Sequence, residues 1–171
     1  IFTSTMSVYG DVKSNKKISE IYPCNPKSIY GISKIAAENI LKELCEKNNI
    51  KFVILRLFNV YGPYQNLDNL KQGMLSIFLH YILNSKKIVV KGSLNRFRDF
   101  IYISDLIDVF NILIRNKTKN TVYNIGTEKK TNIKQLISLL IKHLNKDYKT
   151  IKVVETKNTP GDIKGFIADT S

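Results

Sequence analysis

The sequence is poor in the residues on which several classes of protein depend. Its 171 residues include no Trp, two His and two Cys. Cys24 and Cys45 have neither CxxC nor paired-cluster spacing, so we expect free thiols in a reducing, cytoplasmic setting. His80 and His143 each lie in an apolar helical pattern, which is typical of structural or surface histidines. We therefore expect no metal site.

Long apolar runs are also missing. No segment approaches the roughly 20 residues of a membrane span, so we expect no association with a membrane. The opening residues, IFTSTMSVYG, lack the basic and long apolar parts of a secretory signal. With 43% hydrophobic residues, the chain is long enough for one domain with a substantial core.

Basic residues are abundant, and the formal net charge is +13. The Lys residues are spread along the chain among Ile and Asn, and no RNP, KH, zinc-finger or basic-zipper pattern occurs. We therefore do not expect nucleic acid as the partner. A small anionic ligand, such as a nucleotide diphosphate, needs only a few well-placed Arg or Lys side chains.

Strand and helix patterns alternate in the first part of the chain. Residues 1–8 predict a strand that turns at Gly10, and Asn25-Pro26 predicts a helix start. This helix should run to about Lys47, with an apolar face formed by Ile29, Ile32, Ala36, Ile40 and Leu44. The continuous apolar run KFVILRLFNV predicts a strand buried on both faces of a parallel sheet. Together they make a βαβ unit.

The alternation continues after the breaker Gly62-Pro63. Helices are predicted at 74–83, 105–114 and 131–144, and strands at 86–92, 99–103, 121–126 and 150–155. The fold class is therefore α/β. The chain opens inside a strand and stops at ADTS, where a helix would be expected to begin, so we expect a fragment of a longer protein.

The sequence holds three Tyr-x-x-x-Lys pairs: Tyr9/Lys13, Tyr30/Lys34 and Tyr148/Lys152. Only Tyr30 and Lys34 fall on a predicted helix, where residues four apart share a face. An ammonium group beside a phenol favours the phenolate, which is a usable general base. An ordinary first-turn Tyr with a solvated Lys is the alternative for this pair.

Polar groups are predicted at the carboxyl ends of the two strands that flank this helix. The first strand carries hydroxyls at Thr3, Ser4, Thr5 and Ser7. The second ends at Phe58 and Asn59, although Asn before a turn is also common for local reasons. Open α/β sheets bind ligands at this edge, so these side chains are candidates for a site.

These motifs occur together in one order: STMSVYG, YGISK, LRLFNVYGP, RDFIYISD, YNIGT and PGD. The set resembles the extended short-chain dehydrogenase/reductase family. Within that family it is most similar to the NAD-dependent nucleotide-sugar epimerases and dehydratases of the UDP-glucose 4-epimerase type. Each motif is weak alone, but the ordered set covers nearly the whole chain and is specific.

The resemblance implies catalytic and cofactor-binding roles. Tyr30 is implied as the catalytic base, and Lys34 as the residue that activates it and binds the nicotinamide ribose. Thr5 takes the family's Ser/Thr position beside them, and Phe58 takes a cofactor-contacting position. The implied cofactor is NAD. The implied reaction is a transient oxidation of a sugar hydroxyl, commonly at C4, followed by return of hydride to the opposite face.

Substrate-binding roles are implied for Asn59, Arg98 and Asp162. Asn59 matches a residue that holds the sugar diphosphate, and Arg98 matches an arginine that pairs with the pyrophosphate. A bidentate Arg on phosphate oxygens suits that role. Asp162 belongs to the PGD motif. The implied partners are a nucleotide-diphosphate sugar and a second copy of the chain in a homodimer.

The sequence departs from the family pattern in three places. It has no GxGxxG or GxxGxxG motif, which the family carries in its opening βα units. Met6 and Ser7 stand where the 4,6-dehydratases carry an Asp-Glu pair. Thr159 precedes the PGD motif where an Arg is usual. We therefore expect only the nicotinamide and substrate side of the enzyme here, and an epimerase rather than a dehydratase.

The expected organisation follows from these matches. Residues 1–62 should form the second half of a Rossmann-like NAD-binding domain, with the Tyr/Lys helix. Residues 63–171 should form mostly a small α/β substrate-binding region with interleaved Rossmann elements. A reductase, decarboxylase or dehydratase of the same family is an alternative. A non-catalytic assembly or nucleic-acid-binding module is an alternative from another class.

Overall fold

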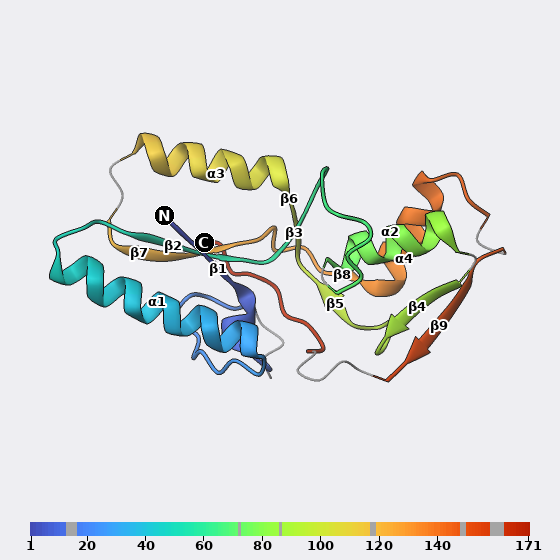
Figure 1. The fold of residues 1–171 in the computed structure, drawn as a ribbon, viewed down its shortest axis with the longest axis horizontal. Coiled ribbons are helices and arrows are strands. Elements are labelled where there is room, and N and C mark those ends of the chain that lie inside the picture. The colour runs from blue at the N-terminus through green and yellow to red at the C-terminus, as the bar shows by residue number, and fades with distance from the viewer. Residues whose placement is uncertain (13–16, 72, 86, 117–118, 148–149, 158–162) are drawn as a thin grey trace.

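The computed structural model describes residues 1–12, 17–71, 73–85, 87–116, 119–147, 150–157 and 163–171 (Figure 1). These residues form two lobes. One is built on a parallel sheet with a helix on each face, and the other on two helices and a strand pair. The α/β class predicted from the sequence is therefore confirmed.

The first lobe is centred on a parallel sheet of order β1-β2-β7, with β1 at Phe2–Thr5, β2 at Val53–Leu57 and β7 at Thr121–Ile125. The apolar run that predicted a strand covered on both faces lies in the middle, as β2. Its alternate side chains point to opposite faces. Val53 and Leu55 pack toward α3 (Ile103–Arg115), whereas Ile54 packs toward α1 (Ile29–Lys47). Figure 1 shows these two helices on opposite sides of the sheet.

Helix α1 begins later than predicted. Asn25-Pro26 is not the start, because Ser28 is the N-cap and its hydroxyl accepts a hydrogen bond from the backbone N–H of Gly31. A serine in the extended conformation satisfies one of the free N–H groups of the first turn. The predicted end at Lys47 is confirmed.

The apolar stripe predicted on α1 does not pack on the sheet. Its five members, Ile29, Ile32, Ala36, Ile40 and Leu44, are all exposed. The sheet is instead covered by the face that carries Gly31, Glu38 and Cys45, which are buried. Periodicity located an apolar face correctly, but it did not indicate which surface covers that face.

Strand β1 is shorter than the predicted strand of residues 1–8. It ends at Thr5, and Met6–Tyr9 form a 3-10 helix, η1. The Thr5 side chain causes this change of direction, because its hydroxyl accepts from the backbone N–H of Ser7 at 3.2 Å. The prediction that Ser7 lies on the strand was therefore wrong.

The second lobe packs α2 (Met74–Asn84) and α4 (Ile133–His143) on the parallel pair β4 (Lys87–Lys91) and β9 (Lys152–Thr156). Helix α4 starts at a capping box, in which Asn132 and Gln135 exchange side-chain and backbone hydrogen bonds. This pairing satisfies two free N–H groups at once. The buried core of this lobe contains Phe78, Ile82, Ile88, Val90, Ile133, Leu136, Ile137, Ile141 and Ile151.

Short strand pairs join the lobes. Strand β3 (Asn59–Tyr61) pairs in parallel with β6 (Phe100–Tyr102), and β5 (Phe97–Arg98) pairs with β8 (Thr131–Asn132). Between β5 and β6, the fully buried Asp99 carboxylate accepts from the backbone N–H groups of Thr127, Glu128 and Ala168. The loop after β7 and the C-terminal segment are thereby held at the end of the sheet.

Candidate active site

Two adjoining pockets lie where the parallel strands end, and Asn59 lines both. The strand-end pocket, of about 220 Å³, is lined by Thr5, Met6, Ser7, Gly10, Lys27, Ser28, Phe58, Asn59, Arg98 and Ile163. The larger interlobe pocket, of about 690 Å³, is lined by Tyr30, Asn59, Val60, Tyr61, Gln65, Asn66, Asn69, Lys71, Gly73, Met74, Leu75, Ser76 and Phe100. Ligands of α/β proteins bind at this end of the sheet.

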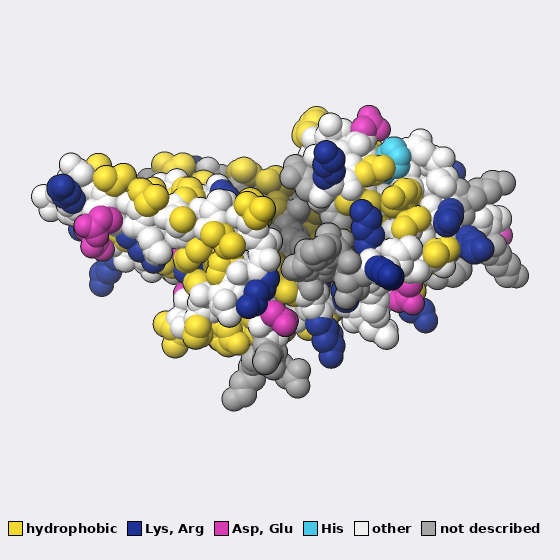
Figure 2. Space-filling model, turned by 60° about the horizontal axis from the view of Figure 1, so that its bottom comes forward, with side chains coloured by type: hydrophobic (Ala, Val, Ile, Leu, Met, Phe, Trp, Pro, Cys, Tyr) yellow, Lys and Arg dark blue, Asp and Glu magenta, His cyan; other side chains and the backbone are white. Residues whose placement is uncertain are grey.

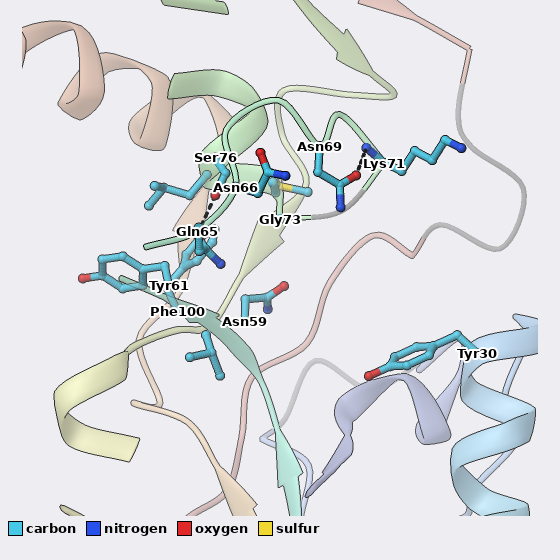
Figure 3. Close-up of a pocket in the computed structure, with 13 residues that line it drawn as sticks. Tyr30, Asn59, Tyr61, Gln65, Asn66, Asn69, Lys71, Gly73, Ser76 and Phe100 are labelled. Atoms are coloured by element: carbon cyan, nitrogen blue, oxygen red, sulfur yellow. Dashed lines mark hydrogen bonds between the residues drawn. The ribbon is translucent and has the colours of Figure 1, made fainter. Parts of the chain in front are cut away.

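Tyr30 lies in the first turn of α1 and is 55% exposed. Figure 3 shows its ring reaching from the helix toward the strand that carries Asn59, across the interlobe pocket. The phenol is therefore presented to the space between the lobes, where it can meet a ligand hydroxyl.

Lys34 lies one turn after Tyr30, on the side of α1 that faces β1. Its Nζ donates to the carbonyl oxygen of Thr3 at 2.8 Å and lies 5.9 Å from the centre of the Tyr30 ring. Nζ also lies 5.0 Å from the centre of the Phe2 ring. The ammonium group is thus held between the strand and the phenol. The helical spacing predicted that the two side chains share a face, whereas the bond to Thr3 is seen only in the structure.

Gly31 allows the Tyr30 turn to lie close to η1. A Cβ at this position would lie 2.6 Å from the carbonyl oxygen of Ser7 and 2.9 Å from Cβ of Pro26. Because one of these neighbours is backbone, the clash could be relieved only by moving the helix. The glycine therefore permits the close approach of the Tyr30 turn to the Thr5–Ser7 segment.

Thr5 and Ser7 form the hydroxyl side of the strand-end pocket. Thr5 Oγ1 donates to Ser7 Oγ at 3.3 Å while it caps η1. Phe58 is buried, and its ring meets the Phe166 ring edge to face at 5.7 Å between centres. The structure thus places Thr5 and Phe58 on one pocket, although they are 53 residues apart in the sequence.

Asn59 is fixed by its neighbours at the point where the pockets meet. Its Nδ2 donates to the carbonyl oxygen of Asp99 at 2.9 Å and lies 3.4 Å from Sδ of Met6. With the amide nitrogen held, the orientation of Oδ1 is also determined. Figure 3 shows the side chain beneath the loop that closes the interlobe pocket.

Arg98 is buried beside the strand-end pocket. Its Nη1 donates to the carbonyl oxygens of Phe97 and Ile163 at 2.7 and 3.2 Å. Burial, and then the nearby charge of Arg96, lower the pKa of Arg98 to about 10. Its guanidinium therefore remains charged at neutral pH. Asp162 and Thr159 lie outside the described residues.

The charged groups around the two pockets share one sign. Lys27, Arg98 and Lys71 line them, and none of the lining residues that the structure describes is Asp or Glu. Such a surface favours an anionic ligand, because positive charges converge on a partly enclosed space. Within the same part of the chain, no three His, Cys, Asp or Glu side chains gather as metal ligands would.

Sequence reasoning missed two parts of this region. The loop after β3 contributes Gln65, Asn66 and Asn69 to the interlobe pocket. An amide-rich loop after FNVYGP was the available signal. The second part is the buried ion pair of Glu38 with Arg56, whose signal was a lone Arg in the middle of the apolar β2 run.

The side chains around the two pockets suit one end of a dinucleotide cofactor. A phenol, an ammonium group, hydroxyls and an aromatic ring meet at the carboxyl ends of parallel strands. The glycine-rich turn that cradles the pyrophosphate in dinucleotide folds does not occur in this sequence. Side chains of these types suit the reacting end of such a cofactor.

The fold and pockets define an α/β protein with a parallel sheet and a ligand cleft at its strand ends. Residues 1–126 match the model of the NAD dependent epimerase/dehydratase family. The chain belongs to this family, which confirms the resemblance found in the sequence and the family's dependence on NAD.

Curated relatives include enzymes of three activities. The chain is 37% identical over 140 residues to dTDP-4-dehydro-6-deoxyglucose reductase of Escherichia coli, covering 82% of this chain and 43% of the relative. It is 36% identical over 137 residues to a putative UDP-glucose 4-epimerase of Methanocaldococcus jannaschii, covering 80% and 43%. It is 32% identical over 141 residues to human dTDP-D-glucose 4,6-dehydratase, covering 82% and 39%.

Solved structures of related enzymes have the same fold over nearly the whole of this chain. UDP-N-acetylglucosamine 4-epimerase from Methanobrevibacter ruminantium has a TM-score of 0.89 and 33% identity, covering 99% of this chain and 53% of that one. UDP-glucuronic acid 4-epimerase from Bacillus cereus, solved with UDP-glucuronic acid and NAD, has a TM-score of 0.87 and 31% identity, covering 98% and 51%. The predicted Rossmann-like sheet is thus confirmed. The chain spans about half the length of these structures and less than half of the curated relatives.

Proposed function

We propose that this chain is part of an NAD-dependent nucleotide-sugar 4-epimerase of sugar-nucleotide or surface-polysaccharide synthesis. The observation that carries the proposal is the pair of pockets at the strand ends. They combine a phenol, hydroxyls and an amide with positive charge from Lys27, Lys71 and Arg98. A sugar supplies hydroxyls and a diphosphate supplies negative charge, so a nucleotide-diphosphate sugar matches both properties.

Each predicted site residue within the described part of the chain takes one role in this proposal. Tyr30 removes the proton from a sugar hydroxyl, and Lys34 and Thr5 support the phenolate and the reacting oxygen. Asn59 and Arg98 hold the diphosphate, and Arg98 does so through charge-assisted hydrogen bonds. Phe58 flanks the cofactor. Bound NAD supplies the hydride acceptor and donor for the transient oxidation.

The residues beside Thr5 favour an epimerase over a dehydratase. Loss of water from the sugar needs an acid near the departing hydroxyl. At this point the chain has Met6, which is buried with its sulfur against Asn59, and Ser7. A thioether does not donate a proton, so the machinery for water loss is lacking among these neighbours.

A reductase is the second candidate. It is favoured by the 37% identity with the Escherichia coli dTDP-4-dehydro-6-deoxyglucose reductase. A reductase uses the same phenol to protonate the carbonyl oxygen while hydride is consumed. The two activities differ in their redox balance, because an epimerase regenerates its cofactor and a reductase does not.

The test is to incubate the full-length enzyme with UDP- and dTDP-sugars and to identify the products by NMR, with and without added NADH or NADPH. We expect inversion at one sugar carbon with no net change in absorbance at 340 nm. Stoichiometric consumption of reduced cofactor would show a reductase, and release of carbon dioxide a decarboxylase. Formation of a 4-keto-6-deoxy sugar by loss of water would overturn the proposal.

We also propose that the enzyme is a homodimer joined through α1. Its outward stripe exposes Ile29, Ile32, Ile40 and Leu44, and Ile29 is 87% exposed. Figure 2, which brings the lower side of Figure 1 forward, shows hydrophobic side chains running over this lobe. An apolar helix stripe of this kind is stabilised when an identical stripe covers it about a twofold axis.

An Ile32→Glu substitution is therefore expected to convert the full-length enzyme from dimer to monomer, because it places a charge in the contact. Light scattering after size-exclusion chromatography measures the mass directly. Leu139→Glu, on the exposed side of α4, is the matched control and should leave the mass unchanged. A dimer that persists in Ile32→Glu and Ile40→Glu contradicts this interface.

We also propose that the enzyme is cytoplasmic and binds neither nucleic acid nor a membrane. Cys24 and Cys45 are free thiols, which suits a reducing cytoplasm. No helix among the described residues has both the length and the apolar character to cross a membrane. On the face shown in Figure 2, Lys and Arg side chains are scattered and do not form a stripe.

A further inference from the structure

A row of polar side chains crosses the sheet one residue below the strand ends. Ser4 on β1 pairs in register with Arg56 on β2, and Arg56 pairs with Asn124 on β7. All three are buried and face the α1 side. The strands β1, β2 and β7 each end at the next residue, and on β1 this residue is Thr5, which lines the strand-end pocket. This row therefore lies directly beneath the candidate active site.

Glu38 of α1, the helix that covers this face of the sheet, contacts two members of the row. The fully buried carboxylate accepts from Ser4 Oγ at 2.5 Å and from Arg56 Nη2 at 2.8 Å. Arg56 Nε lies 3.1 and 3.3 Å from the two carboxylate oxygens, so the ion pair is bidentate. One side chain of the helix is thus held by two strands at the same time.

Tyr9 connects the row to η1. Its hydroxyl accepts from Arg56 Nη1 at 3.1 Å and donates to Asn124 Oδ1 at 2.6 Å. Burial raises the pKa of the Tyr9 phenol, so it keeps the proton that it donates. Ser4, Tyr9, Glu38, Arg56 and Asn124, here called the Glu38 cluster, thereby join five elements of the lobe.

The cluster shares a helix face with the proposed base. Tyr30, Lys34 and Glu38 follow one another at four-residue intervals, so they lie in a line along α1. Glu38 is fixed to the Ser4 hydroxyl, and Lys34 to the Thr3 carbonyl oxygen. The helix is thus bonded to β1 at two successive turns, and the turn that precedes them carries Tyr30. On the strand, Thr5 directly follows Ser4.

We propose that Ser4 is a positioning residue, which acts through Glu38 to set the distance between the Tyr30 phenol and the Thr5 hydroxyl. The proposal rests on the function proposed above. Apolar packing could hold α1 on the sheet without a buried ion pair, whose desolvation is costly. Directional hydrogen bonds fix the position of the helix along the strand, which apolar contacts do not. Small displacements of reacting groups can cost large factors in rate.

The test compares Ser4→Ala and Ser4→Thr variants of the full-length enzyme. Ser4→Ala is expected to lower kcat about 10-fold with KM within about twofold of wild type, because the base is misplaced while the substrate is still held. Ser4→Thr restores the hydroxyl and should recover most of kcat. Hydrogen exchange of the first two turns of α1 should be faster in Ser4→Ala than in wild type. Thr121→Ala, which removes a hydroxyl at the other end of β7, is the control.

Each outcome bears on the proposal. Wild-type kcat in Ser4→Ala, or a loss that Ser4→Thr does not restore, overturns it. If Ser4→Ala does not fold, Tyr9→Phe removes the two hydrogen bonds of the Tyr9 hydroxyl in the cluster and should lower kcat about threefold. A wild-type enzyme without activity on any sugar nucleotide would contradict the proposed function. In that case unchanged exchange in Ser4→Ala would still refute the positioning of α1.

Discussion

A Tyr30→Phe variant of the full-length enzyme is expected to lose about 10²- to 10⁴-fold in kcat, the usual contribution of a positioned general base. Phe retains the ring and the helix propensity, so only the hydroxyl is removed. Affinity for the sugar nucleotide should change little, because the diphosphate is assigned to Asn59 and Arg98. Initial rates and calorimetric binding measure the two effects separately.

Tyr64→Phe is the matched control for this experiment. Tyr64 lies in the loop after β3, is fully exposed and does not line either pocket. Its variant should retain wild-type rates. If Tyr30→Phe also retains most of the activity, the phenol is not the base, and a non-catalytic role for this lobe gains support.

A Glu38→Ala variant is expected to lose about 3–5 kcal/mol in the free energy of unfolding, because it leaves the buried charge of Arg56 without its carboxylate. Arg56 is 4% exposed and Glu38 fully buried, so water cannot replace the lost partner. Burial acts to lower the pKa of Arg56, but the hydrogen bonds to Glu38 and Tyr9 outweigh it and raise that pKa. A guanidinium is a strong enough base to stay charged at neutral pH without a carboxylate partner, so Arg56 remains charged when Glu38 is removed.

Denaturant unfolding of the full-length enzyme measures this loss. Glu46→Ala, which removes an exposed carboxylate two turns later on the same helix, should change stability by no more than about 0.5 kcal/mol. The double variant Glu38→Leu/Arg56→Met should be less destabilised than the sum of its two single variants, because it removes both charges together. A loss below about 1 kcal/mol in Glu38→Ala would show that the pair is not a determinant of stability.

Much of the fold followed from local pattern. The alternation of strands and helices, the two covered faces of β2 and the extent of α2 are as the periodicity predicted. The predicted start of α1 was wrong, because two capping signals, Asn25-Pro26 and Ser28, lie within four residues of each other. In the structure Ser28 caps the helix, and Gly31 in its first turn packs against Ser7 and Pro26.

The candidate site was predictable in its residue types and less so in its geometry. Tyr30, Lys34, Thr5, Phe58 and Asn59 were selected by spacing, strand ends and family resemblance, and the structure gathers them around the strand ends. The amide loop of the interlobe pocket was missed, because loop residues carry no periodic signal that relates them to a distant strand. Asp162 and Thr159 stay predictions.

The sequence by itself determined the α/β class and the helical spacing of Tyr30 and Lys34, since each depends on residues close together in the chain. It also determined the family, through the order of short motifs along the chain. Only the tertiary structure decided three other matters. It turned the apolar stripe of α1 outward, it placed Ser4, Arg56 and Asn124 in one row, and it joined that row to Glu38. The physical reason is that strand register and helix facing depend on contacts between segments 18 to 68 residues apart, which no local pattern records.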